Sequence, residues 1–352
     1  MTERKKLHIE LLRMLAIFFV IMNHTGDRGQ LYYLAIHEQP VHWLLMGFSA
    51  LHKAAVPIFF LCSGALLLEK EESLGTLLKK RVLRFALVLL LFSLVAYLQQ
   101  VAQEGRGFNV FYFVTHLYSQ PLVYFYWYLY SYLGYLLMLP FLRRLARGMS
   151  DREYLYMLAL WAGVKVLELL PFWLIETDLP LQENFVLFTM EYTVFFPLMG
   201  HFLEHRAPEK LYGGKTAALS ALSALLAIAI MCLTTERWCR LNGSWPDYAG
   251  ELYFGTLNFV VALALYLQAK TLFLRRQVGP GIEKTLTLFG SCSFGLYLLQ
   301  QDYLLWLAPV HDWLAPRLGT YPACLLWVLL ICLVGTVVTW LLKQIPGLKK
   351  LL

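Results

Sequence analysis

The chain has 352 residues, of which 59% are hydrophobic and only 15% are charged, and its mean hydropathy is +0.56. This composition excludes an ordinary water-soluble protein and indicates a polytopic membrane protein. The net charge of +7 does not indicate a nucleic-acid-binding protein, because the basic residues are divided among loops between apolar runs. The six cysteines form no CxxC pair, so neither a disulfide framework nor a metal site is predicted.

Windows of about 20 apolar residues predict an all-α protein with ten membrane-spanning helices in a single integral domain over residues 1–352. The expected spans are 9–27, 44–68, 82–101, 124–142, 154–174, 185–203, 216–233, 251–268, 286–307 and 322–342. Most of the 30 Lys and Arg residues fall in alternate loops, beginning with the N-terminal segment. Because basic loops favour the cytoplasmic side, both termini are predicted to be cytoplasmic.

The first apolar run, IELLRMLAIFFVIMNHTG, contains an arginine and a histidine, Arg13 and His24. An ionisable side chain at membrane depth is usually kept because it pairs, lines a cavity or takes part in chemistry. The two residues are eleven positions apart, so on an α-helix they share a face and lie roughly 16 Å apart along the axis. Simpler interpretations are that Arg13 extends to the headgroups and that His24 bonds a neighbouring helix.

Polar side chains also interrupt the second and fifth apolar runs. Lys53, next to His52, is expected either to line the same cavity as His24 or to extend toward the outer surface. Lys165 and Glu168 are three residues apart, so they are neighbours on a helix and can neutralise each other.

The loop after the second run reads EKEESLGTLLKKRVLR and leads directly into the third run. Arg81 and Arg84 are neighbours on a helix, and with Lys80 they form a compact basic cluster at the cytoplasmic face. Guanidinium groups suit phosphates because each offers two parallel N–H hydrogen-bond donors. The alternative is an anchor that only sets membrane orientation.

Aromatic and acidic residues mark two of the predicted outside segments. They suit a sugar site, but they are equally typical of an interfacial belt and an acidic loop. The residues concerned include Phe111, Tyr118 and Tyr124, and also Glu176, Asp178 and Glu183.

Further segments complete an ordered series of motifs along the chain. The second run contains VPIFFLCSGALLL at 56–68, the fourth contains YWYLYSYLGYLLMLPFL at 126–142 with Trp127, and the ninth contains SFGLYLLQ at 293–300. Together with Arg13 through His24 and RVLR at 81–84, this series resembles the membrane-bound acyltransferase 3 family. That family carries R-x10-H in its first membrane helix, an R-x-x-R element and a late SFGIYLIH stretch. One departure is Gln300, which stands where many members have histidine.

The resemblance implies a membrane O-acyltransferase. It would move an acyl group, commonly acetyl, from cytoplasmic acyl-coenzyme A to a hydroxyl of a cell-envelope glycan or related surface molecule, in the cell membrane. His24 is expected to be the catalytic base, with transient acylation of its ring as the alternative, and Arg13 is expected to be its partner. Lys80, Arg81 and Arg84 are expected to bind the phosphates of coenzyme A. Trp127, Lys53 and Gln300 are expected to contact the acceptor, and no metal is expected.

Two other classes of function stay open at this stage. A transporter or flippase for an envelope precursor would also keep Arg13, Lys53, Lys165 and Glu168 at membrane depth. A catalytically idle sensor or scaffold would keep the fold as a membrane anchor for a partner. The intact pair of Arg13 and His24 argues against the idle scaffold.

Overall fold

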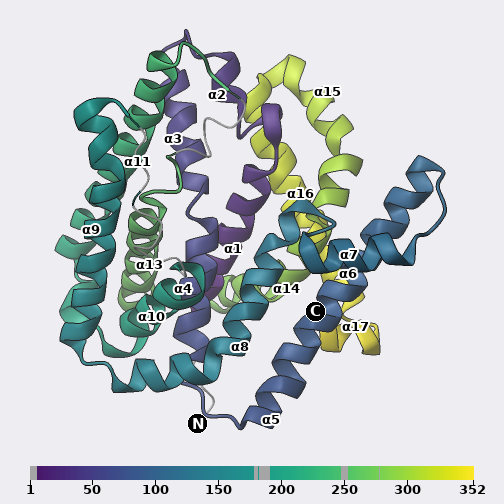
Figure 1. The fold of residues 1–352 in the computed structure, drawn as a ribbon, viewed down its shortest axis with the longest axis horizontal. Coiled ribbons are helices and arrows are strands. Elements are labelled where there is room, and N and C mark those ends of the chain that lie inside the picture. Colours follow the sequence, from purple (N-terminus) through teal and green to yellow (C-terminus); the bar gives the residue numbers. More distant parts are fainter. Residues whose placement is uncertain (1–5, 178–180, 182–190, 247–252, 277) are drawn as a thin grey trace.

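The computed structural model describes residues 6–177, 181, 191–246, 253–276 and 278–352. In these residues all regular structure is helical and no strand occurs, which confirms the predicted all-α class. Figure 1 shows the helices packed side by side in one bundle, from which the hairpin of α6 and α7 projects at one side.

The helices follow the predicted apolar runs. The longer ones are α1 (Leu7–Asn23), α3 (His42–His52), α4 (Ala55–Leu67), α6 (Leu83–Glu104), α7 (Val110–Ser119), α8 (Trp127–Gly148), α9 (Asp151–Ile175), α11 (Gly214–Leu241), α13 (Asn258–Arg275), α14 (Pro280–Trp306), α15 (Ala308–Leu318) and α16 (Thr320–Leu342). The shorter ones are η1 (Gly26–Arg28), α2 (Tyr32–Ala35), α5 (Leu74–Leu77), η2 (Leu78–Val82), η3 (Tyr124–Tyr126), η4 (Glu191–Phe195), α10 (Phe196–His201), η5 (Phe202–Arg206), η6 (Glu209–Tyr212) and α17 (Pro346–Leu351). The first residues of the spans predicted at 185–203 and 251–268 lie outside the described residues.

Each predicted span contains helix, but not every helix can cross a bilayer by length and composition alone. Among the described residues, five helices can do so, or six if α7 and α8, which are bent by 48°, form one span. The helix α1 falls short because it has 17 residues, and α14 because polar residues interrupt its 27-residue length. The polytopic class is therefore confirmed, while the count of ten spans stays a prediction.

Apolar side chains cover the outer surface of the bundle. Only 22% of the most apolar stretch of α5–α6, 17% of that of α9 and 22% of that of α11 are buried inside the protein. Surfaces this apolar are expected to face lipid, since a soluble protein rarely exposes such continuous patches. In contrast, α1 is enclosed, because it packs against α3, α4, α13, α14 and α16.

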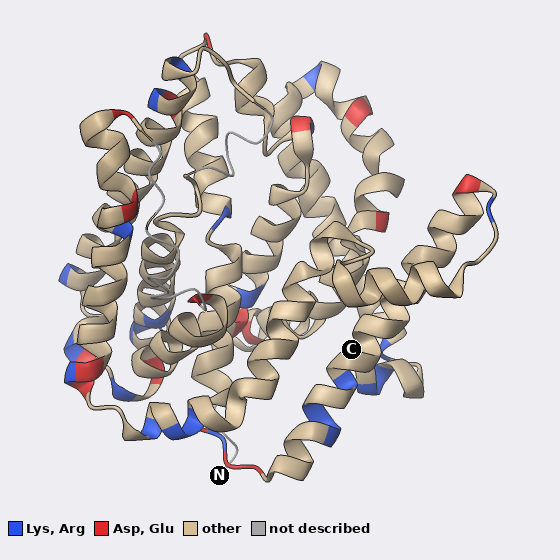
Figure 2. Cartoon of the chain, in the orientation of Figure 1, with Lys and Arg blue, Asp and Glu red and all other residues tan. Residues whose placement is uncertain are grey.

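Lys and Arg residues gather at one edge of the bundle. Figure 2 shows them along the edge where the described chain begins, around α5 and the turn between α8 and α9. Few lie at the opposite edge. This distribution agrees with the rule that basic residues mark the cytoplasmic side, so we refer to this edge as the basic edge.

Two glycines allow α4 and α10 to approach closely. A Cβ added at Gly64 would overlap the backbone carbonyl of Pro197, and one added at Gly200 would overlap the carbonyl of Leu61. Small residues serve this purpose at helix contacts in membranes, because they let two backbones meet.

Gly64→Ala is therefore expected to destabilise the protein by about 1–3 kcal/mol, because a backbone carbonyl cannot rotate away from the added methyl group. The measurement is the apparent melting temperature of the purified protein in detergent. Gly134→Ala on α8 is the control, since no atom lies within 4 Å of its added Cβ. An unchanged melting temperature for Gly64→Ala would contradict this account of the contact.

Candidate active site

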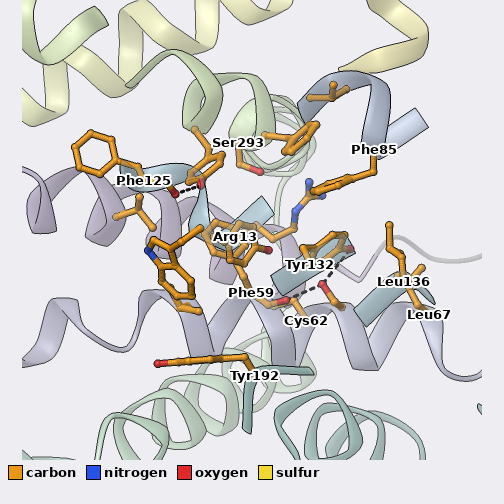
Figure 3. A pocket seen from close by; sticks show the side chains of 18 of the residues that line it. Arg13, Phe59, Cys62, Leu67, Phe85, Phe125, Tyr132, Leu136, Tyr192 and Ser293 are labelled. Atoms are coloured by element: carbon orange, nitrogen blue, oxygen red, sulfur yellow. Dashed lines mark hydrogen bonds between the residues drawn. The ribbon is translucent and has the colours of Figure 1, made fainter. Parts of the chain in front are cut away.

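A cavity of about 830 Å³ lies between α1, α4, α6, α8 and α14. Its lining includes Lys80, Arg81 and Arg84 toward the basic edge, and Asn23 and His24 at the end of α1. The volume falls within the usual range for ligand sites, roughly 300–1,000 Å³. Figure 3 shows that aromatic side chains, among them Phe59, Phe85 and Tyr132, form much of the cavity wall.

The predicted site residues converge on this cavity from five separate parts of the chain. Seven of the eight line it, and the eighth, Gln300, contacts His24 from α14. The seven are Arg13, His24, Lys53, Lys80, Arg81, Arg84 and Trp127. The shared face of Arg13 and His24, inferred from their spacing, is thus present in the structure.

Arg13 reaches into the cavity from the middle of α1. Figure 3 shows its guanidinium extending toward Phe85, within the aromatic wall. Its Nη1 donates to Glu10 Oε2 at 3.3 Å, one helical turn earlier. Because Arg13 lines the cavity, its charge is directed at the interior of the bundle instead of the surrounding lipid.

His24 is the residue that caps the C-terminus of α1. Its Nδ1 lies 3.0 Å from Oε1 of Gln300. The ring of Phe125 packs against the imidazole, with 3.8 Å between the ring centroids. The imidazole is therefore held by α14 on one side and by the segment before α8 on another.

A break between α3 and α4 brings Lys53 into the cavity wall. In a regular α-helix the carbonyl of Lys53 would accept a hydrogen bond from the backbone N–H of residue 57, but Pro57 has no N–H. That carbonyl accepts a hydrogen bond from Asn258 Nδ2 at 3.4 Å, and the carbonyl of His52 accepts one from Asn23 Nδ2 at 2.9 Å. Broken backbone at membrane depth is tolerated where it lines a cavity and its polar groups are satisfied in this way.

The basic end of the cavity is built around Glu72. Its Oε1 accepts from Arg81 Nε at 2.7 Å and from Arg143 Nη2 at 2.9 Å. Burial raises the pKa of Glu72, but the hydrogen bonds from Arg81 and Arg143 outweigh this and lower it below its ordinary value. Arg84 donates from Nε and Nη2 to the carbonyl of Leu351, in α17, at 3.2 and 3.1 Å. Both arginines are thus held at the cavity by groups that an anionic ligand can replace.

Most of the aromatic outside segment lies away from this cavity. Tyr124 lines it, whereas Phe111 and Tyr118, on α7, are 78% and 92% exposed and face outward. Glu176 forms an ion pair with Arg237 at 2.6 Å on the outer part of the bundle. Asp178 and Glu183 lie outside the described residues. The exposed rings agree with the interpretation of an interfacial belt.

The family to which the chain belongs follows from its overall sequence. A model of the acyltransferase 3 family, described as an acyltransferase domain, matches residues 7–343. The chain belongs to the acyltransferase 3 family. It is therefore a membrane acyltransferase, as the resemblance implied. No curated protein and no solved structure matches this acyltransferase.

Sequence reasoning did not single out several residues that shape the site of this acyltransferase. Asn23 and Asn258 cap the broken helix, Glu72 links two arginines, and Phe125 packs on His24. Pro57, four residues after Lys53, is a local signal that a helix breaks at this point. The contacts of Glu72 and Phe125 join distant parts of the chain, so no local pattern indicates them. Among the described residues, no three His, Cys, Asp or Glu side chains gather as metal ligands.

Proposed function

We propose that this acyltransferase transfers an acyl group, in the first instance acetyl, from cytoplasmic acyl-coenzyme A to a hydroxyl group of a cell-envelope glycan or related surface molecule. The observation that supports this most is the single cavity that connects the basic cluster with His24. Such a cavity suits a donor that is anionic at one end and reactive at the other. The host membrane in this proposal is the cell membrane.

The basic end suits the phosphates of coenzyme A. The cavity wall there carries three cationic side chains that can donate hydrogen bonds, Lys80, Arg81 and Arg84. A guanidinium group can bind two phosphate oxygens at once. A bound phosphate would take the place of Glu72 on Arg81 and of the Leu351 carbonyl on Arg84. The thioester would then extend past Arg13 toward His24.

The chemistry at the other end is a direct acyl transfer. Nε2 of His24 takes the proton from the acceptor hydroxyl, and the oxygen attacks the thioester carbonyl. A carbon–oxygen bond forms, the carbon–sulfur bond breaks, and the coenzyme A thiolate leaves and takes up a proton. Positioning of the two substrates in the cavity supplies much of the remaining rate enhancement. Lys53 and Trp127, which line the same cavity, are proposed to contact the acceptor.

The structure contains little that favours the transporter. Of the four residues at membrane depth, Arg13 and Lys53 line the cavity. Lys165 instead forms ion pairs with Glu168 at 3.0 Å and with Glu191 at 2.8 Å, on α9 and η4. Their mutual neutralisation accounts for two of the residues that a translocation path would use.

The proposed function is tested with purified protein in proteoliposomes. The proteoliposomes receive labelled acetyl-coenzyme A and a pool of envelope glycans, and label on the glycan is measured after correction for hydrolysis. Label that appears on a glycan with the parent protein and not with His24→Ala supports the proposal. Absence of both donor binding and transfer contradicts it and favours a transporter or a scaffold. Donor binding without transfer supports the donor assignment and contradicts the choice of glycan acceptors.

A further inference from the structure

Gln300 is one of the most enclosed polar side chains next to the cavity. It lies on α14, is 1% exposed and does not line the cavity itself. Its Oε1 lies 3.0 Å from His24 Nδ1, across 276 residues of sequence. Its Nε2 is buried and has no hydrogen-bond partner among the described residues. The amide therefore makes one directed contact, and that contact is with the imidazole.

This contact has a consequence for the proton on the imidazole. A neutral imidazole carries its proton on one nitrogen and a lone pair on the other. An amide oxygen accepts hydrogen bonds and cannot donate them, so Oε1 of Gln300 favours the form with the proton on Nδ1. The lone pair is then on Nε2, the nitrogen farther from Gln300. That form of His24 is the one that can take a proton from a hydroxyl.

A second contact from α14 restricts the rotation of the same ring. Tyr297, three residues before Gln300, donates from its hydroxyl to the backbone carbonyl of Phe125. Tyr126 donates to the carbonyl of Leu298 at 2.9 Å. These bonds hold the segment before α8 on α14, and so hold the Phe125 ring against His24. The helix α14 thus positions both the hydrogen-bond partner of the imidazole and the ring that packs against it.

We propose that Gln300 is a positioning residue that holds His24 with its proton on Nδ1 and its lone pair on Nε2. This inference rests on the proposed function for its catalytic meaning, but the protonation of the ring is measurable without turnover. The sequence led us to expect that Gln300 contacts the acceptor. We instead assign Gln300 a contact with the proposed base, His24.

The first test is ¹⁵N NMR of the histidine-labelled protein in bilayers, with His24 assigned by comparison with His24→Ala. We expect the parent to show a protonated Nδ1 and an unprotonated Nε2, and Gln300→Leu to populate the form with the proton on Nε2. Gln301→Leu is the control, because Gln301 is the exposed neighbour on the same helix. A parent with its proton on Nε2, or the same form in the parent and Gln300→Leu, would overturn the proposal.

The second test separates positioning from general damage to the fold. We expect Gln300→Leu to lower kcat by roughly 10- to 100-fold, a part of the 10² to 10⁴-fold that a general base contributes, with KM for acetyl-coenzyme A unchanged. Gln300→Glu keeps an oxygen that can accept from Nδ1, so it is expected to retain more of kcat than Gln300→Leu. Equal kcat for the two variants, or a loss confined to KM, would contradict the inference. A parent that transfers no acyl group would contradict the proposed function and leave the NMR result to decide the role of Gln300.

Discussion

Alanine in place of His24 is expected to lower the rate of acyl transfer by about 10² to 10⁴-fold, the usual contribution of a general base. The physical reason is that an alcohol is a poor nucleophile near pH 7 unless a base removes its proton. The measurement is turnover of labelled acetyl-coenzyme A in proteoliposomes. Binding of the donor is expected to persist, because the basic cluster lies at the other end of the cavity.

Two further variants make the result for His24 specific. His24→Gln keeps a polar side chain that can contact Gln300 but cannot act as a base, so it is expected to be as inactive as His24→Ala. His37→Ala removes an exposed histidine that does not line the cavity, and it is expected to keep the parent rate. Parent-like turnover by His24→Ala in correctly inserted protein would mean that another group removes the proton.

Hydropathy predicted where the helices lie but not how they are interrupted. The run predicted at 44–68 is one candidate span, His42–Leu67, but a short turn at Lys53 and Ala54 divides it into α3 and α4. The described part of the run at 185–203 is continuous helix, but its geometry changes from the π-helical η4 to α10 and then to the π-helical η5. Apolar composition is insensitive to such breaks, because a broken segment is as apolar as a continuous one. Only backbone effects such as that of Pro57 distinguish the two.

The parts of the site that could be predicted from sequence are those within one helix or loop. The spacing of Arg13 and His24 fixes their shared face, and the spacing of Arg81 and Arg84 fixes their proximity. The contact between His24 and Gln300 could not be predicted in this way, because it depends on how α1 packs against α14. From the sequence, Gln300 was instead expected to contact the acceptor, because its amide can accept and donate hydrogen bonds.

Replacing Arg81 by alanine is expected to weaken binding of acetyl-coenzyme A by roughly 10- to 100-fold. A hydrogen bond to a charged group contributes about 1.5–3 kcal/mol, and each 1.4 kcal/mol changes an affinity about tenfold. Arg81 lines the cavity, so its loss removes a side chain that binds phosphate from the end of the cavity proposed to hold coenzyme A. Donor affinity is measured by calorimetry or by displacement of a labelled donor, and kcat at saturating donor is expected to change much less.

Variants of Glu72 and Arg144 serve as controls for this prediction. Glu72→Gln removes the negative charge that accepts from Arg81 at 2.7 Å, so donor affinity is expected to stay equal or to rise. Arg144→Ala removes one exposed positive charge close to the basic end, but Arg144 does not line the cavity, so affinity is expected to remain near that of the parent. Equal weakening by Arg81→Ala and Arg144→Ala would indicate a general effect of surface charge. Unchanged affinity in Arg81→Ala would contradict the phosphate role of Arg81.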